Sequence, residues 1–365
     1  MKYRKLGKTG TEVSVIGLGC RGFGRRGVSE ADCIRTVEVA MDNGVNFFDT
    51  ADVYGDGQSE TILGKALRGK PRDNFIIATK GGSERLPGAG ERQNGDPRFL
   101  RKALESSLRR LGMDYVDLYQ LHNPDPAVPL SVTAEAFARF VEEGKVRYIG
   151  VSNMSPEELR EWLSYIGDTV SIQLPYSVAD VRRVVSLYAT GEFQRISLIP
   201  WTPLFNGWLV NPPAREPEKR TGLAAAFTEE FIEALNDAAQ ELGKIAADRK
   251  SPLSAVGLAF VMAHPAVASV PVGAVRPEHL LEDLRACELT LDESDLERLS
   301  QTARKMPKPE VVARLKVRDV LRDGRVAVLE MGAKVRVPEP VKPGDELEVD
   351  MWDLSVKAVH RTGPA

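Results

Sequence analysis

The segment FFDTADVYG at residues 47–55 decides the fold: an apolar run of strand type stops at a carboxylate, and a phenol follows five residues later. Two later segments, IIATK at residues 76–80 and VDLYQLH at residues 116–122, also end at one ionisable residue each. Such runs are typical of buried strands, and residues at the ends of parallel strands meet at one edge of the sheet. We therefore expect an acid, a phenol, an amine and an imidazole to converge. These residues are Asp49, Tyr54, Lys80 and His122.

Short runs rich in Val, Ile and Phe alternate with helical patterns from residue 13 to about residue 286. This rhythm predicts parallel strands joined by crossover helices. Eight strands close a (β/α)8 barrel, so the predicted fold class is an α/β TIM barrel. Strands are expected at residues 13–18, 46–50, 75–79, 116–121, 148–151, 171–174, 197–201 and 268–272. Helices are expected at residues 34–42, opened by Ser29, and at 60–67, 99–111, 132–142, 156–164, 178–187, 229–263 with a break at Pro252, and 277–285.

Both ends of the chain have a different pattern from the barrel. Residues 1–13 predict an N-terminal β-hairpin. The last part alternates apolar and polar residues, with turn signals at residues 323–324 and 343–345, which predicts short antiparallel strands. We therefore divide the chain into a barrel at residues 1–309 and a small β-rich C-terminal extension at residues 310–365. We expect the extension to pack on the barrel, or to form a contact with a second subunit or a partner, without joining catalysis.

The composition excludes several classes of partner. The 365 residues contain 49 Lys and Arg against 52 Asp and Glu, so there is no basic field for nucleic acid or anionic lipid. No signal peptide and no apolar run of membrane-spanning length is visible, and we expect a cytoplasmic protein without membrane contact. Cys20, Cys33 and Cys287 have neither metal-ligand spacing nor a disulfide framework, so buried thiols and no metal site are expected.

The segment GLGCRG at residues 17–22 satisfies the G-x-G-x-x-G pattern of dinucleotide-binding sites and follows a predicted strand. In a true site, the helix starts within the glycines so that its N-terminus faces the pyrophosphate. Here a polar segment at residues 24–27 delays the helix until after Ser29. We therefore reject a Rossmann site at this position.

Taken in order, the strand-end motifs resemble those of the aldo-keto reductase superfamily, whose acid-to-tyrosine signature is similar to residues 49–55. The resemblance covers nearly all of residues 1–305. Ordered motifs over such a span are more specific than any single motif. The further motifs are ATK at 78–80, QLH at 120–122, IGVSN at 149–153, Gln173, WTPL at 201–204, VGA at 272–274 and HLLEDL at 279–284.

The resemblance implies an NAD(P)H-dependent oxidoreductase that reversibly reduces an aldehyde or ketone to an alcohol. Tyr54 would be the general acid that protonates the carbonyl oxygen. The ammonium of Lys80 would stabilise the phenolate that remains, and Asp49 would hold Lys80 in place and keep it charged. His122 would orient the substrate oxygen.

The resemblance also implies NADPH as cofactor, with NADH as the alternative. Hydroxyl and amide groups suit the nicotinamide carboxamide, and a forked cation suits an adenosine 2′-phosphate. Ser152, Asn153 and Gln173 are expected at the carboxamide, with Trp201 stacked on the ring. Pyrophosphate and adenosine contacts are expected from Thr202, Leu204, Asn206, Gly273, Arg276, His279, Glu282 and Asp283. His279, Glu282 and Asp283 stand where the family commonly has Gln, Glu and Asn, and a surface role is the equal alternative for Arg276.

Two other functions are alternatives. A nicotinamide-sensing regulatory protein on the same barrel, similar to the potassium channel β subunits, would bind cofactor without turnover. A phosphate-binding barrel of unrelated chemistry would need anion-binding glycines after the last two strands, and Gly273 alone does not meet that need. The substrate is expected to be a small carbonyl compound, chosen by the loops at residues 81–97 and 205–221.

Overall fold

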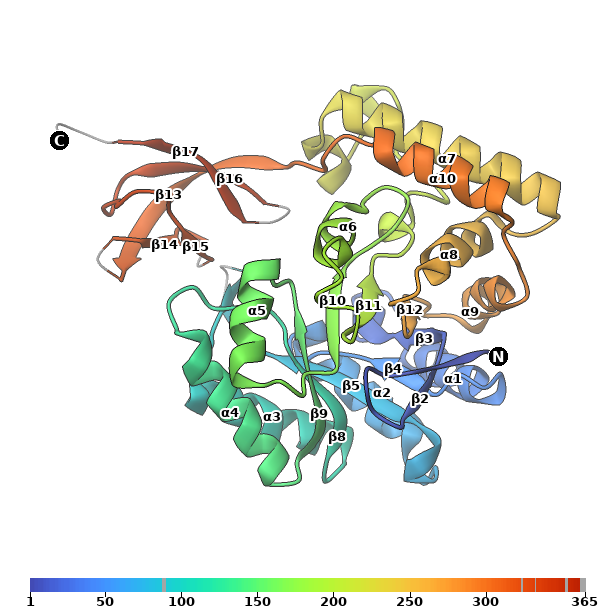
Figure 1. Cartoon of the computed structure of the whole chain (residues 1–365), viewed down its shortest axis with the longest axis horizontal. Helices are drawn as coiled ribbons and strands as arrows, with labels where there is room; N and C mark the ends of the chain where they lie inside the picture. The colour runs from blue at the N-terminus through green and yellow to red at the C-terminus, as the bar shows by residue number, and fades with distance from the viewer. Residues whose placement is uncertain (87–89, 323, 332, 352–353, 362–365) are drawn as a thin grey trace.

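The computed structural model describes residues 1–86, 90–322, 324–331, 333–351 and 354–361 (Figure 1). Its main body is an eight-stranded parallel sheet in the order β11-β10-β9-β8-β5-β4-β3-β12. Leu198 bonds through its backbone to Ala266 and Ala268, which joins the two ends of this sheet and closes the barrel. The predicted (β/α)8 fold is confirmed. The strands are β3 (Ile16–Gly19), β4 (Phe47–Asp49), β5 (Ile76–Gly81), β8 (Val116–Leu121), β9 (Val146–Ser152), β10 (Ser171–Pro175), β11 (Ser197–Trp201) and β12 (Val270–Val272).

Helices follow the strands along the chain and cover the outside of the barrel (Figure 1). Their starts follow local chemistry: Ser29 accepts a hydrogen bond from the Asp32 backbone, and Ser155 and Glu158 form a reciprocal capping box. Pro252 separates two helices, as expected. The helices are α1 (Glu30–Asp42), α2 (Gln58–Leu67), α3 (Pro97–Leu111), α4 (Leu130–Glu142), α5 (Pro156–Tyr165), α6 (Arg182–Tyr188), α7 (Glu229–Arg249), α8 (Leu253–Ala263), α9 (Pro277–Leu284) and α10 (Glu293–Lys305).

Alternate side chains of each strand point into the barrel, because the side-chain period of a strand is two. Phe47, Ile76 and Leu118 belong to one buried cluster inside the ring of strands. The N-terminal hairpin of β1 (Tyr3–Lys5) and β2 (Glu12–Ser14) adds Leu6 and Val13 to the same cluster. The predicted hairpin is therefore confirmed, and it plugs one end of the barrel.

The structure corrects four local expectations. Val13 pairs with Arg4 in the hairpin, so it is not part of the first barrel strand, which begins at Ile16. Ser177 and Asp180 bond to each other in a turn, so the helix expected from residue 178 begins only at Arg182. The 81–97 region, expected as a loop, contains an antiparallel hairpin of β6 (Ser83–Leu86) and β7 (Gly90–Gln93). Helix α10 was not predicted.

The C-terminal region forms a five-stranded antiparallel sheet in the order β15-β14-β13-β16-β17, as its alternating pattern predicts. Val317, Leu329 and Leu347 lie in a buried cluster of its own. The turn expected at residues 343–345 is present, whereas Asp323 of the other predicted turn lies outside the described residues. The strands are β13 (Val312–Leu321), β14 (Val326–Leu329), β15 (Lys334–Arg336), β16 (Glu346–Asp350) and β17 (Ser355–His360).

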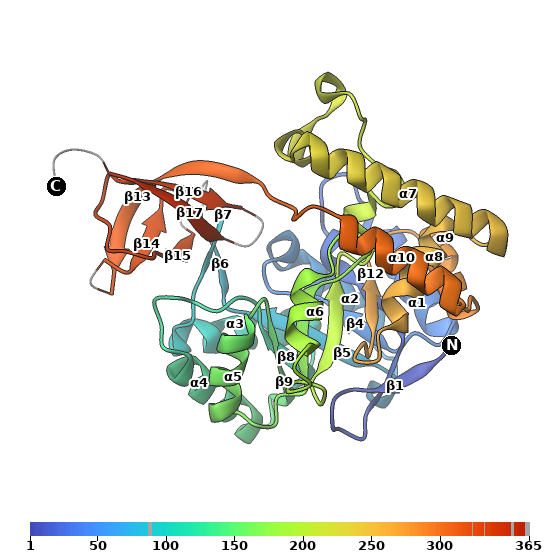
Figure 2. The same ribbon diagram turned by 45° about the horizontal axis from the view of Figure 1, so that its top comes forward.

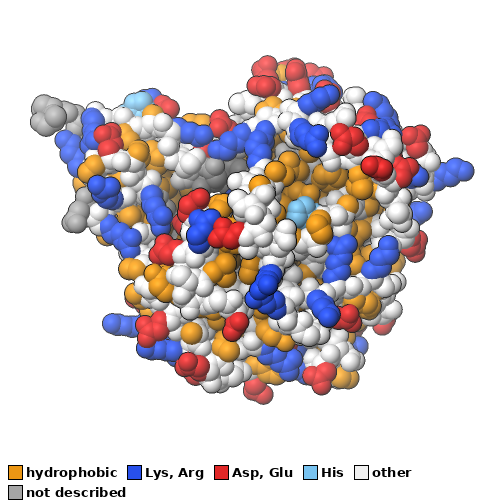
Figure 3. Space-filling model, in the orientation of Figure 1, with side chains coloured by type: hydrophobic (Ala, Val, Ile, Leu, Met, Phe, Trp, Pro, Cys, Tyr) orange, Lys and Arg blue, Asp and Glu red, His pale blue; other side chains and the backbone are white. Residues whose placement is uncertain are grey.

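This C-terminal sheet lies beside the β6–β7 hairpin of the barrel (Figure 2). Lys334 of β15 donates through Nζ to the fully buried carboxylate of Asp125 at 2.7 Å, and through its backbone to Gln93 Oε1 at 3.1 Å. On the face seen in Figure 3, the surface is hollowed between the C-terminal sheet and the region of α7 and α10, and charges of both signs are mixed. None of the helices in the described ranges is both long and apolar enough to cross a membrane.

Candidate active site

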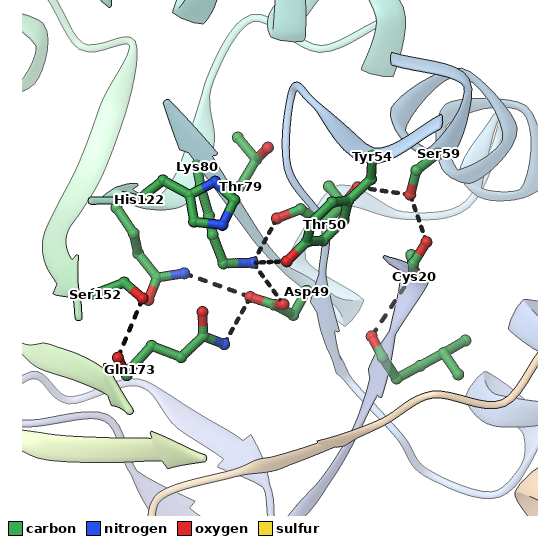
Figure 4. Close-up of polar contacts among 12 residues, drawn as sticks. Cys20, Asp49, Thr50, Tyr54, Ser59, Thr79, Lys80, His122, Ser152 and Gln173 are labelled. Atoms are coloured by element: carbon green, nitrogen blue, oxygen red, sulfur yellow. Dashed lines mark hydrogen bonds and ion pairs between the residues drawn. The ribbon is translucent and has the colours of Figure 1, made fainter. Parts of the chain in front are cut away.

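Lys80 and Asp49 form a buried ion pair at the ends of neighbouring strands (Figure 4). Lys80 shares the inward parity of Ile76 in β5, and Asp49 shares that of Phe47 in β4, so alternation turns both into the barrel. The distance from Lys80 Nζ to Asp49 Oδ2 is 2.7 Å, and only 1% and 7% of the two side chains are exposed. A second hydrogen bond joins Lys80 Nζ to the carbonyl of Thr50 at 2.8 Å.

Tyr54 meets this ion pair from the short turn that follows β4. Lys80 Nζ donates to Tyr54 Oη at 3.4 Å and also lies 4.9 Å from the centre of its ring. Gly55 and Asp56 both have a positive φ, and this tight 3-10 turn, η2 (Tyr54–Gly57), directs the phenol back over the strand end. An ammonium is thus in hydrogen-bond contact with the phenol.

The imidazole of His122 completes the group. Its ring meets that of Tyr54 edge to face, with 5.9 Å between the ring centres. The backbone of His122 donates to the Gly81 carbonyl at 2.8 Å, which fixes the residue just beyond the end of β8. The structure therefore brings together all four residues that the strand ends predict.

The electrostatics of the group follow from burial and from charge pairing. Burial alone would lower the pKa of Lys80, but its interactions with Asp49 and then Tyr54 outweigh burial, so the pKa is raised and the amine stays protonated. Burial first, and then the positive charges of Lys80 and Arg21, lowers the pKa of His122 to about 3. His122 is therefore a neutral imidazole at any physiological pH.

Amide side chains surround the second oxygen of Asp49. Gln120 and Gln173 donate through Nε2 to Asp49 Oδ1 at 3.4 and 3.3 Å. The Ser152 hydroxyl donates to the backbone carbonyl of Gln173 at 3.1 Å. Of the predicted cofactor residues, Gln173 therefore contacts Asp49 directly, and Ser152 contacts Gln173.

A chain of side-chain hydrogen bonds runs along the rim from β11 to β8. Trp201 Nε1 donates to Asn153 Oδ1 at 3.1 Å, and Asn153 Nδ2 donates to Asn123 Oδ1 at 3.0 Å and to the His122 carbonyl at 3.1 Å. Beyond Trp201, Thr202 has a φ of 50°, which is strained for a β-branched residue, and such strain is concentrated at functional sites. Leu204 and Asn206 follow in the same loop.

The predicted adenosine residues lie apart from the four-residue group, on and before α9. Arg276 is exposed at the N-cap of this helix, and Gly273 lies exposed just after β12. Glu282 accepts a hydrogen bond from Ser254 at 2.9 Å. Burial, followed by the charge of Glu282, raises the pKa of Asp283 to about 7. His279 is exposed on the same helix.

The sequence patterns do not assign a role to two polar residues that the structure places at the site, Gln120 and Asn123. Gln120 could have been found from alternation, because it stands two residues after the inward-facing Leu118. Glu60 of α2 was not predicted either: it is fully buried and accepts from Thr79, whose strand parity is opposite to that of Lys80, at 2.6 Å and from Arg110 at 2.7 Å. Asn123 follows the strand end and carries no local signal of its contacts.

The chain is similar in sequence to proteins of one known family. The family profile described as "Aldo/keto reductase family" matches residues 15–304. The "Uncharacterized oxidoreductase YqkF" of Bacillus subtilis (strain 168) is 33% identical over 291 residues, covering 78% of this chain and 91% of its own length. The "Probable aldo-keto reductase 1" of Glycine max is 30% identical over 299 residues, covering 80% and 86% respectively.

Two solved structures of aldo-keto reductases have a fold similar to that of this chain. The aldo-keto reductase AKR11C1 from Bacillus halodurans, in its holo form, matches 83% of this chain and 96% of its own, with a TM-score of 0.69 and 30% identity. A thermostable aldo-keto reductase, Tm1743, in complex with the inhibitor epalrestat, matches 83% of this chain and 100% of its own, with a TM-score of 0.67 and 29% identity.

Proposed function

Since this chain belongs to the aldo/keto reductase family and is an NAD(P)H-dependent oxidoreductase, we propose that it reduces a small aldehyde or ketone with NADPH and with Tyr54 as the proton donor. The observation that supports the proposal best is the contact at 3.4 Å between Lys80 Nζ and Tyr54 Oη, with the side chain of Lys80 almost fully buried. A phenol gives up its proton more readily where a fixed positive charge stabilises the phenolate.

Buried polar atoms without a hydrogen-bond partner at the rim support the binding of a nicotinamide there. Gln120 Oε1 and His122 Nδ1 are buried and have no hydrogen-bond partner among the described residues, so both can bond to a bound molecule. Ser152, Asn153 and Gln173 offer the hydroxyl and amide groups that a carboxamide requires. When bound there, the nicotinamide would supply the hydride that adds to the carbonyl carbon.

The protein's own residues would handle the proton and the position of the substrate. Tyr54 would give its hydroxyl proton to the carbonyl oxygen, and Lys80 would stabilise the phenolate that remains. The neutral His122 would donate one ring N–H to the same oxygen and hold it near Tyr54. Asp49 would keep Lys80 charged and in place, and in alcohol oxidation Tyr54 would take the proton back.

The remaining cofactor roles are part of the same proposal. Trp201 would stack on the nicotinamide ring, and the loop with Thr202, Leu204 and Asn206 would contact the pyrophosphate. Gly273, Arg276, His279, Glu282 and Asp283 would face the adenosine half, with Arg276 on a 2′-phosphate. This last contact is the reason to prefer NADPH over NADH.

We also propose that residues 1–309 are the reductase and that residues 310–365 support it without joining catalysis. Among the described residues, the C-terminal sheet contributes Lys334 to a buried ion pair with Asp125 and no side chain to the four-residue group. Deleting residues 310–365 should therefore leave carbonyl reduction largely intact in a folded barrel. Loss of the reaction in a folded truncation would refute this division.

The test is nicotinamide oxidation by the purified protein. With a panel of small aromatic and aliphatic aldehydes, NADPH absorbance should fall, and it should fall faster than NADH absorbance at equal concentration. Replacing Arg276 by Gln should narrow that difference by raising KM for NADPH alone. Tight NADPH binding with no turnover of any aldehyde would instead favour the nicotinamide-sensing alternative.

A further inference from the structure

The segment CRGFGRRG at residues 20–27 follows β3 and has no role in the proposed reaction. Its first residues form a short 3-10 helix, η1 (Cys20–Gly22). The Cys20 carbonyl accepts a hydrogen bond from the Ser59 hydroxyl at 2.7 Å, and this hydroxyl lies 2.8 Å from that of Thr50 (Figure 4). The segment is therefore tied to the part of the chain that carries Asp49 and Tyr54.

Close packing fixes this segment against the turn of Tyr54. Gly24 has a φ of +74°, and a Cβ added there would lie 2.4 Å from the Cβ of Gln58. A Cβ added to Gly55 would lie 2.9 Å from the backbone oxygen of Phe23. Since only glycine fits at both contacts, the loop is held directly beside η2.

Two arginines of this loop, Arg21 and Arg25, are exposed, and their side chains have no ion-pair or hydrogen-bond partner in the part of the chain that the structure describes. Asp56 follows Gly55 in the turn beside this loop, but it is paired with another residue: the guanidinium of Arg85 lies 2.7 Å from Asp56 and 3.2 Å from Glu91. The loop therefore presents two unpaired positive charges beside the site.

Arg21 interacts electrostatically with His122, and Arg25 with Tyr54. The pKa of His122 is lowered by burial, then by Lys80, and then by Arg21. The pKa of Arg25 is lowered by partial burial and then by Arg21, while Tyr54 acts in the opposite direction. Each arginine therefore lies within electrostatic reach of one of the two side chains that would hold the substrate oxygen.

We propose that Arg21 and Arg25 bind a carboxylate or phosphate group of the substrate, so that the preferred substrates are anionic aldehydes or ketones. This proposal rests on the proposed carbonyl reductase function. A guanidinium presents parallel N–H donors that match a carboxylate or phosphate, and two of them on one rigid loop give both charge and geometry. The anion would be bound while the carbonyl faces Tyr54 and His122.

The cofactor is a second source of the same chemistry. A Cβ on Gly22 would lie 2.5 Å from Val275 Cγ1, so the loop also touches the residue before Arg276. A cofactor phosphate could therefore reach these arginines instead. The experiment must separate a substrate anion from a cofactor anion.

The experiment compares matched aldehydes, 4-carboxybenzaldehyde against 4-methylbenzaldehyde, in the wild type and in Arg21→Gln and Arg25→Gln. Arg26→Gln is the control, because Arg26 is an exposed arginine of the same loop and, unlike Arg21, is not among the causes of the lowered pKa of His122. NADPH affinity is measured separately by fluorescence quenching. In Arg21→Gln and Arg25→Gln, kcat/KM for the carboxylated aldehyde should fall at least about tenfold more than for the neutral one, as expected for a lost charge-assisted contact.

The outcomes separate cleanly. An equal fall in kcat/KM for both aldehydes would overturn the proposal, because the arginines would then not recognise the carboxylate. A change confined to NADPH affinity would also overturn it and would assign the arginines to cofactor binding. An effect of similar size in Arg26→Gln would overturn it too. If neither aldehyde is turned over, the carbonyl reductase function fails, and calorimetry with 4-(hydroxymethyl)benzoate on the NADP⁺-loaded protein then decides. Binding that both variants lose would support the anion site, and binding that they keep would refute it.

Discussion

Replacing Lys80 by Met should destabilise the protein strongly, because the ion pair with Asp49 is almost completely buried. Lys80 Nζ lies 2.7 Å from Asp49 Oδ2, with 1% and 7% of the side chains exposed. Removing one partner leaves a buried carboxylate with only two long amide contacts. Breaking such a pair costs about 3–5 kcal/mol. The chain offers a matched control in Lys65, which lies at the same 2.7 Å from Glu30 but with 45% and 46% of the side chains exposed.

The free energy of unfolding is measured by urea titration near neutral pH, followed by circular dichroism. Lys65→Met should cost less than about 1 kcal/mol, because solvent screens an exposed pair. Adding Asp49→Asn to Lys80→Met should restore part of the loss, because a neutral amide needs no counter-charge. The raised pKa of Lys80 sets the pH window: the stabilisation is complete below the unfolded value of 10.5 and is lost only as pH rises through the folded-state pKa.

Activity is the second readout of the same variants. Lys80→Met should lower kcat by about 10²–10⁴, the range of general acid catalysis, with little change in NADPH affinity. The reasoning fails if Lys80→Met and Lys65→Met lose similar stability, or if the double variant is less stable than Lys80→Met alone.

Two further predictions concern the rest of the site. His122 has a folded-state pKa of about 3, below the ordinary 6.5. Between these two pH values the imidazole is protonated in the unfolded chain and neutral in the folded chain. The free energy of unfolding should therefore fall by up to about 1.4 kcal/mol per pH unit as pH drops below 6.5. The His122→Asn variant should show a smaller slope. An imidazole of His122 that titrates near pH 6 by NMR would contradict this prediction. Lys334→Met should lower the free energy of unfolding by about 1–3 kcal/mol and should speed hydrogen exchange in the loop around Asp125. The control is Lys357→Met, which removes a partly exposed ion pair with Glu310 and should change neither quantity. Unchanged exchange would mean that the C-terminal sheet does not brace this loop.

The barrel and the four-residue group could be predicted because both depend on local pattern. Apolar runs mark strands, and the residue at which each run stops lies at the shared edge. Asp49, Lys80 and His122 are such residues, and Tyr54 follows by a short turn. Alternation within a strand would also have identified Gln120.

Other features depend on contacts between distant segments, which no local pattern contains. Lys334 and Asp125 are 209 residues apart, the first in β15 and the second in the loop between β8 and α4. The β6–β7 hairpin was hidden because its strands are polar and half exposed, so they lack the apolar signal of a core strand. In the sequence, Arg21 lies in the rejected glycine motif and Arg25 in the polar segment after it, and only the folded chain places their charges beside Tyr54 and His122.

The central claim is that Tyr54 supplies the proton while NADPH is bound independently of it. The most direct measurement is the single-turnover rate of Tyr54→Phe, with NADPH affinity determined on the same sample. We predict that the rate falls by about 10²–10⁴ while the NADPH Kd stays within about twofold, because Phe keeps the ring and loses only the hydroxyl. A variant that keeps most of the wild-type rate would show that another group is the acid.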